Sequence, residues 1–144
     1  MGQQQLLLII LGVIIVGIAI AVGLQLFQAG SIGANQDAIV NDIMNVAAHA
    51  DQFRIRPETM GGGSGEFTGG GGYTLPERLE ETGNARFTGE GAEVTPAAES
   101  ITIRAVSIQH DGWVQLVYTP NADPGEGETQ YAWTSGGVFA GTFD

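Results

Sequence analysis

Three acidic residues that lie close together are the first candidates for chemistry in this sequence. Asp123, Glu126 and Glu128 fall in a segment that also contains proline and glycine, so their carboxylates are expected on a loop. Carboxylate oxygens are ligands that suit Ca²⁺, but the spacing is not that of an EF-hand. We therefore expect a solvated acidic loop, with a Ca²⁺ site as the alternative, and no other metal or cofactor.

Other groups that could do chemistry are scattered along the chain. His49 and His110 are far apart and have no acidic partner at ligand spacing, which favours structural or solvated histidines. The sequence contains no cysteine, and neither a Ser-His-Asp order nor a pair of carboxylates at catalytic spacing stands out. We therefore expect a protein that is not an enzyme.

Aromatic and basic side chains could instead form a binding surface. Four aromatic residues are expected mainly in a sheet core, with a carbohydrate or protein contact as the alternative: Trp113, Tyr118, Tyr131 and Trp133. Arg54, Arg56 and Arg78 lie near the expected junction between a helix and a domain, where they could pair with carboxylates of neighbouring copies.

The charge balance of the chain excludes some partners. Its 144 residues include 16 Asp or Glu and only 5 basic residues, all arginine, for a formal net charge of −11. Nucleic acids are bound by clustered basic surfaces, so we expect no nucleic-acid partner. Docking on anionic lipid is disfavoured for the same reason.

The longest uniform feature of the sequence is apolar. Every residue from Leu6 to Leu24 is apolar or glycine, Leu26 and Phe27 extend the run, and no charged side chain precedes Asp37. About 20 apolar residues let an α-helix cross a bilayer core, and a helix satisfies its own backbone groups in lipid. We expect residues 1–27 to form a helix that enters a membrane or packs against copies of itself.

Targeting signals fit this segment poorly. A secretory signal peptide has a basic start and a short apolar core, whereas residues 1–5 carry no base and the apolar run is longer. We therefore expect no cleavage downstream of the run. An N-myristoylation motif would need Ser or Thr where Leu6 stands.

A helical pattern continues beyond Phe27. An apolar stripe with spacings of three, four and seven residues predicts an amphipathic helix over 28–55, formed by Ile32, Ile39, Ile43, Val46, Ala50 and Phe53. The polar positions are expected elsewhere around this helix: Asn35, Asp37, Asn41, Asp42 and Asn45. No proline occurs before Pro57, so we predict one continuous helix from about Gln3 to Arg54.

Glycine runs separate this helix from the rest of the chain. Residues 56–72 contain two such runs, which are typical of flexible linkers or of tight, close-packed loops, and we predict a linker here. The fragment Phe67–Gly69 recurs at Phe87–Gly89, but three residues do not establish a repeat. Glycines within the apolar run, such as Gly17, would let neighbouring helices approach closely.

Residues 73–144 are predicted to form a small β-rich domain. Thr74 and Glu77 have the spacing of a capping box, which predicts a helix of about two turns ending at Gly83. Strands are expected at 101–105, 113–119, 129–134 and 138–143, with a turn at 111–112. The predicted fold is α+β, with the second half of the long helix packed on a small antiparallel sheet through Ile32, Ile39, Ile43, Val46 and Phe53.

The order of these features resembles that of type IV pilins. The residues that carry the resemblance are MGQQQLLLIILGVIIVGIAIAVGL, followed by Ala34–Asp42, Arg56–Gly63 and Tyr73–Pro76. They are most similar to short pilin-like proteins of Bacteroidota- and Ignavibacteria-like bacteria, and beyond Tyr73 the resemblance is one of architecture. It implies a structural subunit of an extracellular filament, whose helices form the core while the β-domains face outward.

The resemblance also implies partners and a location. Before assembly the monomer would be located in the inner membrane. It would interact with the pilus assembly machinery and polymerise with copies of itself. Residues expected at the contacts between helices are Gln5, Leu8, Leu11, Ile15, Gly17, Ile18, Val22 and Phe27.

The chain departs from the pilin pattern at its start. Type IV pilins carry a glutamate at the fifth mature residue, which pairs with the terminal amine of a neighbour. Gln5 stands there if Met1 is the mature terminus, and Leu7 does if cleavage follows Gly2. The charge is therefore missing in both cases, and so is the proline that usually breaks the apolar half of the helix.

Two other functions stay open. The chain could be a single-span membrane anchor for a small binding domain, or a minor pseudopilin of a secretion system. A simple anchor does not need a stripe that continues to Phe53, and it normally carries Lys or Arg beside the span. The first basic residue here is Arg54, which favours the filament subunit over the anchor.

Overall fold

A computed structural model describes residues 2–140 of the chain, and the chain divides into two units. The first unit ends at Ala34 and the second begins at Asn35. This boundary lies inside the long helix and not at its end, because residues 35–55 share a core with the sheet. The second unit therefore contains both helix and sheet, which is the predicted α+β fold.

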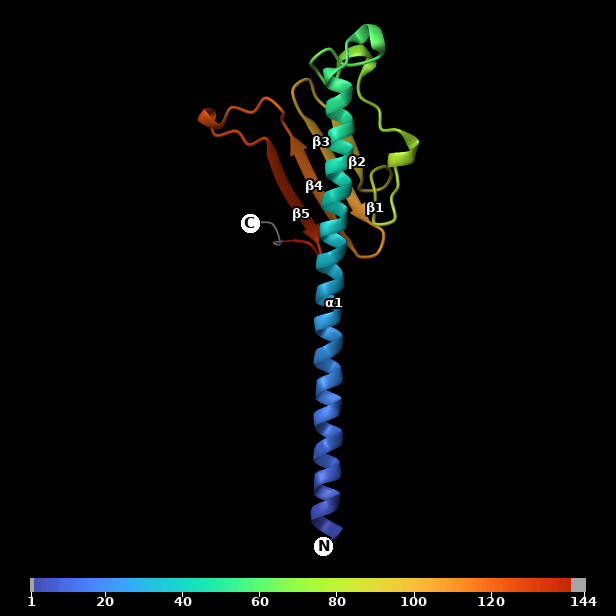
Figure 1. Ribbon diagram of the computed structural model, residues 1–144, viewed down its shortest axis with the longest axis vertical. Coiled ribbons are helices and arrows are strands. Elements are labelled where there is room, and N and C mark those ends of the chain that lie inside the picture. The colour runs from blue at the N-terminus through green and yellow to red at the C-terminus, as the bar shows by residue number, and fades with distance from the viewer. Residues whose placement is uncertain (1, 141–144) are drawn as a thin grey trace. The chain divides into compact units, whose positions relative to one another are not determined.

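The long helix α1 spans Gly2–Ile55, 54 residues without interruption (Figure 1). This confirms the predicted single helix. Nothing in its sequence blocks the backbone hydrogen bonds until Pro57, whose ring disfavours helical geometry at Arg56.

Five antiparallel strands form one sheet (Figure 1). They are β1 (Ala85–Arg86), β2 (Glu93–Pro96), β3 (Ile101–Ser107), β4 (Gly112–Tyr118) and β5 (Tyr131–Gly137). The order is β1-β3-β4-β5, and β2 also pairs with β3. The predictions of β3, β4 and β5 are confirmed, whereas the strand predicted at 138–143 is wrong over 138–140, which form a turn. Residues 141–144 lie outside the described range.

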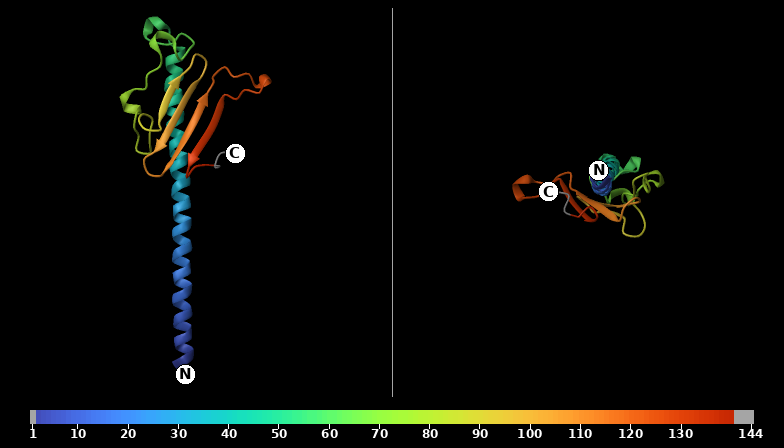
Figure 2. Two further views of the ribbon diagram at one scale, coloured as in Figure 1. Left: turned by 180° about the vertical axis from the view of Figure 1, so that it is seen from behind. Right: turned by 90° about the horizontal axis from the view of Figure 1, so that it is seen from below.

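The core of the second unit lies between α1 and one face of the sheet (Figures 1 and 2). Buried and half-buried residues alternate along β3 and β4, as expected for strands with one covered face. On the helix, Ile39, Ile43 and Ala50 are 0% exposed and Val46 is 1% exposed. A fully buried isoleucine stabilises the fold by about 1.5–3 kcal/mol, so this stripe is a major part of the core.

Three phenylalanines from outside the helix and the strands complete this core. Phe67, Phe87 and Phe139 are all fully buried. Phe139 lies against Gly112 of β4, where a Cβ would collide with the phenyl ring. None of the three was predicted as core. Phe67 and Phe87 lie in segments without helical or strand periodicity, and Phe139 lies in a turn where a strand was predicted.

The glycine-rich segment after α1 is folded against the end of the helix. Its backbone amides donate to carbonyls of the last helical turns and the residues that follow, Gly63 to Phe53 at 2.9 Å and Gly65 to Arg54 at 2.8 Å. Side chains at Gly62, Gly63, Gly69 or Gly70 would collide with backbone or side-chain atoms. Of the two predicted possibilities, this segment is therefore a close-packed loop and not a flexible linker.

The predicted capping box is wrong. The helical piece there is a single 3-10 turn, η3 (Glu77–Leu79), which follows Pro76 and has no side-chain cap. Pro76 fixes its own backbone in an extended conformation just before the turn, so Thr74 is too far away to act as an N-cap.

Candidate functional site

The apolar segment of α1 is exposed throughout the first unit. Its most apolar window has a mean hydropathy of 3.2, and none of that window is buried. The segment is long and apolar enough to cross a membrane. Signal sequences and core helices of soluble proteins can have the same length and composition. A core helix would be largely buried, however, whereas no part of this window is buried within the described residues.

The residues predicted for helix contacts are all exposed. Among them Leu11 is 47% exposed, Ile18 61% and Phe27 75%. At 3.6 residues per turn, five of them fall within about 80° of the helix circumference: Leu8, Leu11, Ile15, Ile18 and Val22. Gln5 and Phe27 lie beyond one edge of this strip, and Gly17 lies beyond the other edge, so Phe27 and Gly17 both face away from the strip. A helix with these positions can contact neighbours on more than one side.

Only the central residues of the predicted packing stripe are buried against the sheet. Ile39, Ile43 and Val46 are buried, while Phe53 is only partly buried and stacks edge-on against Tyr73 at 5.7 Å between ring centroids. Ile32 is partly exposed and belongs to the first unit.

Two polar helix residues lie where the sequence did not predict them. Asn35 is only 5% exposed, and its Oδ1 accepts a 2.7 Å hydrogen bond from the Ser107 hydroxyl of β3. Asp42 accepts hydrogen bonds from Thr82 at 2.7 Å and from Asn84 at 3.1 Å. Asn35 therefore lies on the buried face of the helix and not elsewhere around it as predicted, while Asp42 is half-buried, and partners distant in sequence satisfy both polar groups.

A small pocket lies at the C-terminal end of α1. Its volume is about 190 Å³, and it is lined by His49, Gln52, Phe53, Arg56, Gly61, Tyr73 and Thr74. The Nδ1 atom of His49 and the hydroxyl of Tyr73 are 3.0 Å apart and share a hydrogen bond. Burial, with the nearby charges of Arg78 and Arg56, lowers the pKa of His49 below its ordinary value. Burial raises the pKa of Tyr73 to about 12, so both rings are neutral at pH 7.

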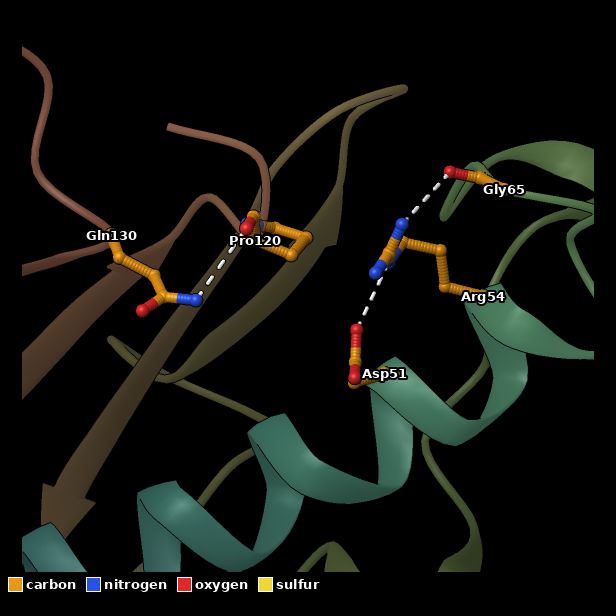
Figure 3. Close-up of polar contacts among 5 residues, drawn as sticks. All are labelled: Asp51, Arg54, Gly65, Pro120 and Gln130. Atoms are coloured by element: carbon orange, nitrogen blue, oxygen red, sulfur yellow. Dashed lines mark hydrogen bonds and ion pairs between the residues drawn. The ribbon is translucent and has the colours of Figure 1, made fainter. Parts of the chain in front are cut away.

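The three arginines predicted near this junction differ in what they contact. Arg54 binds inside its own chain: Nε donates to Asp51 Oδ1 at 2.9 Å and Nη1 to the Gly65 carbonyl at 3.4 Å (Figure 3). Within residues 2–140 this is the one ion pair, so Arg56 and Arg78 have no carboxylate partner there. Both are exposed. We name the pocket together with Arg56 and Arg78 the basic pocket.

The acidic loop, Asn121–Glu128, is exposed and ordered by its own contacts. Asp123 caps the 3-10 turn η4 (Pro124–Glu126) by accepting from the Gly125 amide at 2.8 Å. At its base, the Gln130 side chain donates to the Pro120 carbonyl at 3.4 Å (Figure 3). In the described part of the chain, no three His, Asp or Glu side chains are arranged to hold a metal ion.

The aromatic residues of the sheet divide between its two faces. Tyr118 is buried on the covered face, and Tyr131 stacks on it at 5.2 Å while remaining 41% exposed. Trp113 lies on the other face, where the Arg104 guanidinium covers its ring at 3.9 Å. The predicted core role is therefore right for Tyr118, and Trp113 forms a separate cation–π contact.

Sequence reasoning missed Tyr73 as the partner of His49. Tyr73 is only 5% exposed and follows the second glycine run directly. A lone aromatic residue beside a run of glycines could have indicated this buried position, and the same holds for Phe67.

Compared with known proteins, the chain matches no family model, no curated protein and no solved structure.

Proposed function

We propose that this protein is the structural subunit of an extracellular filament of the type IV pilus kind. The observation that carries the proposal is the apolar part of α1, which is uncharged before Asp37 and exposed along its whole length. Such a surface requires a nonpolar environment, because about 25 cal/mol is lost for each Å² of apolar surface left in water. A membrane supplies that environment before assembly, and the helices of other copies supply it afterwards.

The second unit supports this role. Its core is buried around Ile39, Ile43 and the covered face of the sheet, so the unit needs no partner to shield that core. The whole formal net charge of −11 lies in this unit, since charged residues begin at Asp37. An acidic, soluble unit attached to an apolar helix suits a subunit whose helix is internal and whose domain faces water.

This composition favours a filament over a simple membrane anchor. No basic residue precedes Arg54, whereas membrane anchors normally carry Lys or Arg beside the span. The same helix then continues into the core of the second unit. The assembly would involve copies of the chain itself, the inner membrane and an assembly machinery, and the subunit would act structurally rather than as an enzyme.

Substitution of Gly17 tests the filament. Gly17→Arg should abolish filaments, because an arginine would be buried among apolar helices without a partner. Gly17→Ala is the matched uncharged variant: its methyl group meets no atom of the protomer within 4 Å, and it should lower filament yield at most partially, where close approach of a neighbouring helix is hindered. The measurement is electron microscopy of material sheared from cells that produce each variant.

The result separates the possible functions. Helical filaments that contain the unaltered chain and are lost in Gly17→Arg support the proposal. If the unaltered chain forms no filament, or if Gly17→Arg forms normal ones, the proposal is wrong.

A further inference from the structure

The basic pocket and the acidic loop have complementary charges. In a chain with 16 carboxylates and 5 arginines, Arg56 and Arg78 remain without a carboxylate partner in residues 2–140. The acidic loop carries Asp123, Glu126 and Glu128, and among the described residues none of them has a basic partner. The basic pocket therefore lacks carboxylate partners, and the acidic loop lacks basic ones.

The two surfaces lie on opposite sides of the second unit. In Figure 1, η3 with Arg78 lies at the right of α1, and η4 in the acidic loop lies beyond β5 at the left. Both views in Figure 2 agree with this separation. Figure 1 also shows η3 and η4 at a similar level along α1. A protomer cannot join these surfaces within itself, but a neighbour placed beside it can.

Contacts between different surfaces of identical subunits have a geometric consequence. Such head-to-tail contacts generate rings when the rotation closes and helical filaments when it does not. A contact between the basic pocket of one copy and the acidic loop of its neighbour joins two different surfaces and is therefore of this kind.

The pocket has the chemistry of a carboxylate site. Arginine guanidinium groups donate hydrogen bonds in a planar arrangement that matches a carboxylate. The pocket of about 190 Å³ also presents the Gln52 side chain and the hydroxyl group of Thr74 beside Arg56. Its size suits the end of one side chain and not a whole folded segment.

The acidic loop is suited to enter such a site. The Asp123 cap and the hydrogen bond between Gln130 and Pro120 stabilise the loop in the shape that it has here, and a loop shaped before binding loses less entropy on binding. Glu126 and Glu128 lie at and just beyond its 3-10 turn and are exposed. Building on the proposed filament, we propose that the acidic loop of one copy binds the basic pocket of the next copy and links neighbouring second units laterally.

Charge exchange tests this contact in the full chain. The pair Arg56→Glu and Arg78→Glu should lower filament yield about three- to tenfold, and so should the pair Glu126→Arg and Glu128→Arg. All four changes together should restore the yield, because the complementary charges are then exchanged. Arg86→Glu is the control: it makes the same change at an exposed arginine of β1 and should leave the yield unchanged.

Cysteine cross-linking tests the geometry independently, because the chain contains no cysteine. A chain with both Arg78→Cys and Glu126→Cys should give a ladder of covalent multimers in assembled filaments with a short thiol-specific cross-linker. Each single variant should give dimers at most, since one thiol cannot link more than two copies. The control pair Arg86→Cys with Glu126→Cys should give no ladder.

The outcomes distinguish this contact from the filament itself. Normal filament yield in both charge-reversed pairs, or filaments of the double-cysteine chain without a ladder, would overturn the lateral contact and leave the filament proposal intact. If the unaltered chain forms no filaments, the filament proposal fails first. A ladder together with rescue by the four-residue exchange supports the contact.

Discussion

Single polar residues tie the second unit together at positions that the apolar pattern does not reveal. Asn35 is bound by Ser107 at one end of the shared core, and Asp42 is bound by Thr82 and Asn84 further along. Near the end of α1, His49 shares a hydrogen bond with Tyr73. Each bond joins the helix to a segment more than 20 residues away, so these residues fix how the loops sit on the helix.

His49 should make the stability of the second unit depend on pH. Its pKa is lowered below the ordinary 6.5, first by burial and then by the charges of Arg78 and Arg56. The unfolded chain therefore takes up a proton before the folded chain does as the pH falls through 6.5. The free energy of unfolding should therefore decrease as the pH falls through this window, by a small amount because the His49 ring is only partly buried.

The measurement is denaturant unfolding of the full chain in detergent between pH 7.5 and 5.5. His49→Gln should remove this part of the pH dependence, because glutamine does not titrate. His110→Gln is the matched control, since His110 lies at the turn before β4 and not beside Tyr73. An unchanged pH profile in His49→Gln would contradict the assignment.

Among the larger elements, the glycine loop after α1 differs most from its sequence-based prediction. A glycine run predicts flexibility when it is considered alone, because glycine has the greatest backbone freedom. Here that freedom lets the chain fold back closely over the end of the helix, and Phe67 is buried as a result. The loop therefore acts as part of the core and also forms one wall of the basic pocket through Gly61.

Gly63→Ala should destabilise the second unit strongly. The added Cβ would collide with the carbonyl oxygen of Glu66 and would approach the Phe53 ring. We expect the free energy of unfolding to fall by about 2–4 kcal/mol, as for other changes that overpack a closed site. Gly83→Ala is the control, because a Cβ there meets no atom within 4 Å. Thermal unfolding of both variants would be followed by circular dichroism. Equal midpoint temperatures for Gly63→Ala and Gly83→Ala would contradict the close packing of the loop.

The strands show a second limit of prediction at the element scale. β3 and β4 have seven residues each and alternate between buried and half-buried positions, and so both were predicted. β1 has only two residues and β2 has four, too few for a pattern to appear. Their pairing with β3 depends on the chain between them, which the local sequence does not describe.

At the scale of the whole molecule, the chain combines a unit with an exposed apolar surface and a unit with a closed core. The fully buried residues lie at Ile39 and beyond, so the second unit holds its own core. The formal charge of −11 falls on the same unit, because the first charged residue is Asp37. The residues of α1 from Ile39 onward therefore belong to the folded core, and the proposed polymerisation belongs to the apolar first half of the same helix.

A chain that begins at Ser31 should separate these two properties. It should remain soluble without detergent and unfold cooperatively, because it retains the core from Ile39 to Phe139. It should form no filaments, because the apolar surface is gone. Sedimentation and circular dichroism check the first expectation and electron microscopy the second. Filaments formed by this shortened chain would show that the apolar segment is not the polymerisation surface.

Local, repeating patterns in the sequence determined the long helix, its uncharged apolar first half and the strands β3, β4 and β5, because their hydrogen bonds or side-chain alternation recur every few residues. They also determined the central packing stripe of Ile39, Ile43 and Val46. Only the tertiary structure decided that Phe67, Phe87 and Phe139 close the core, that Asn35 is bound inside it and half-buried Asp42 beside it, and that within residues 2–140 Arg54 is paired while Arg56 and Arg78 are not. These features depend on contacts between segments far apart in the chain, and such contacts leave no period in the sequence.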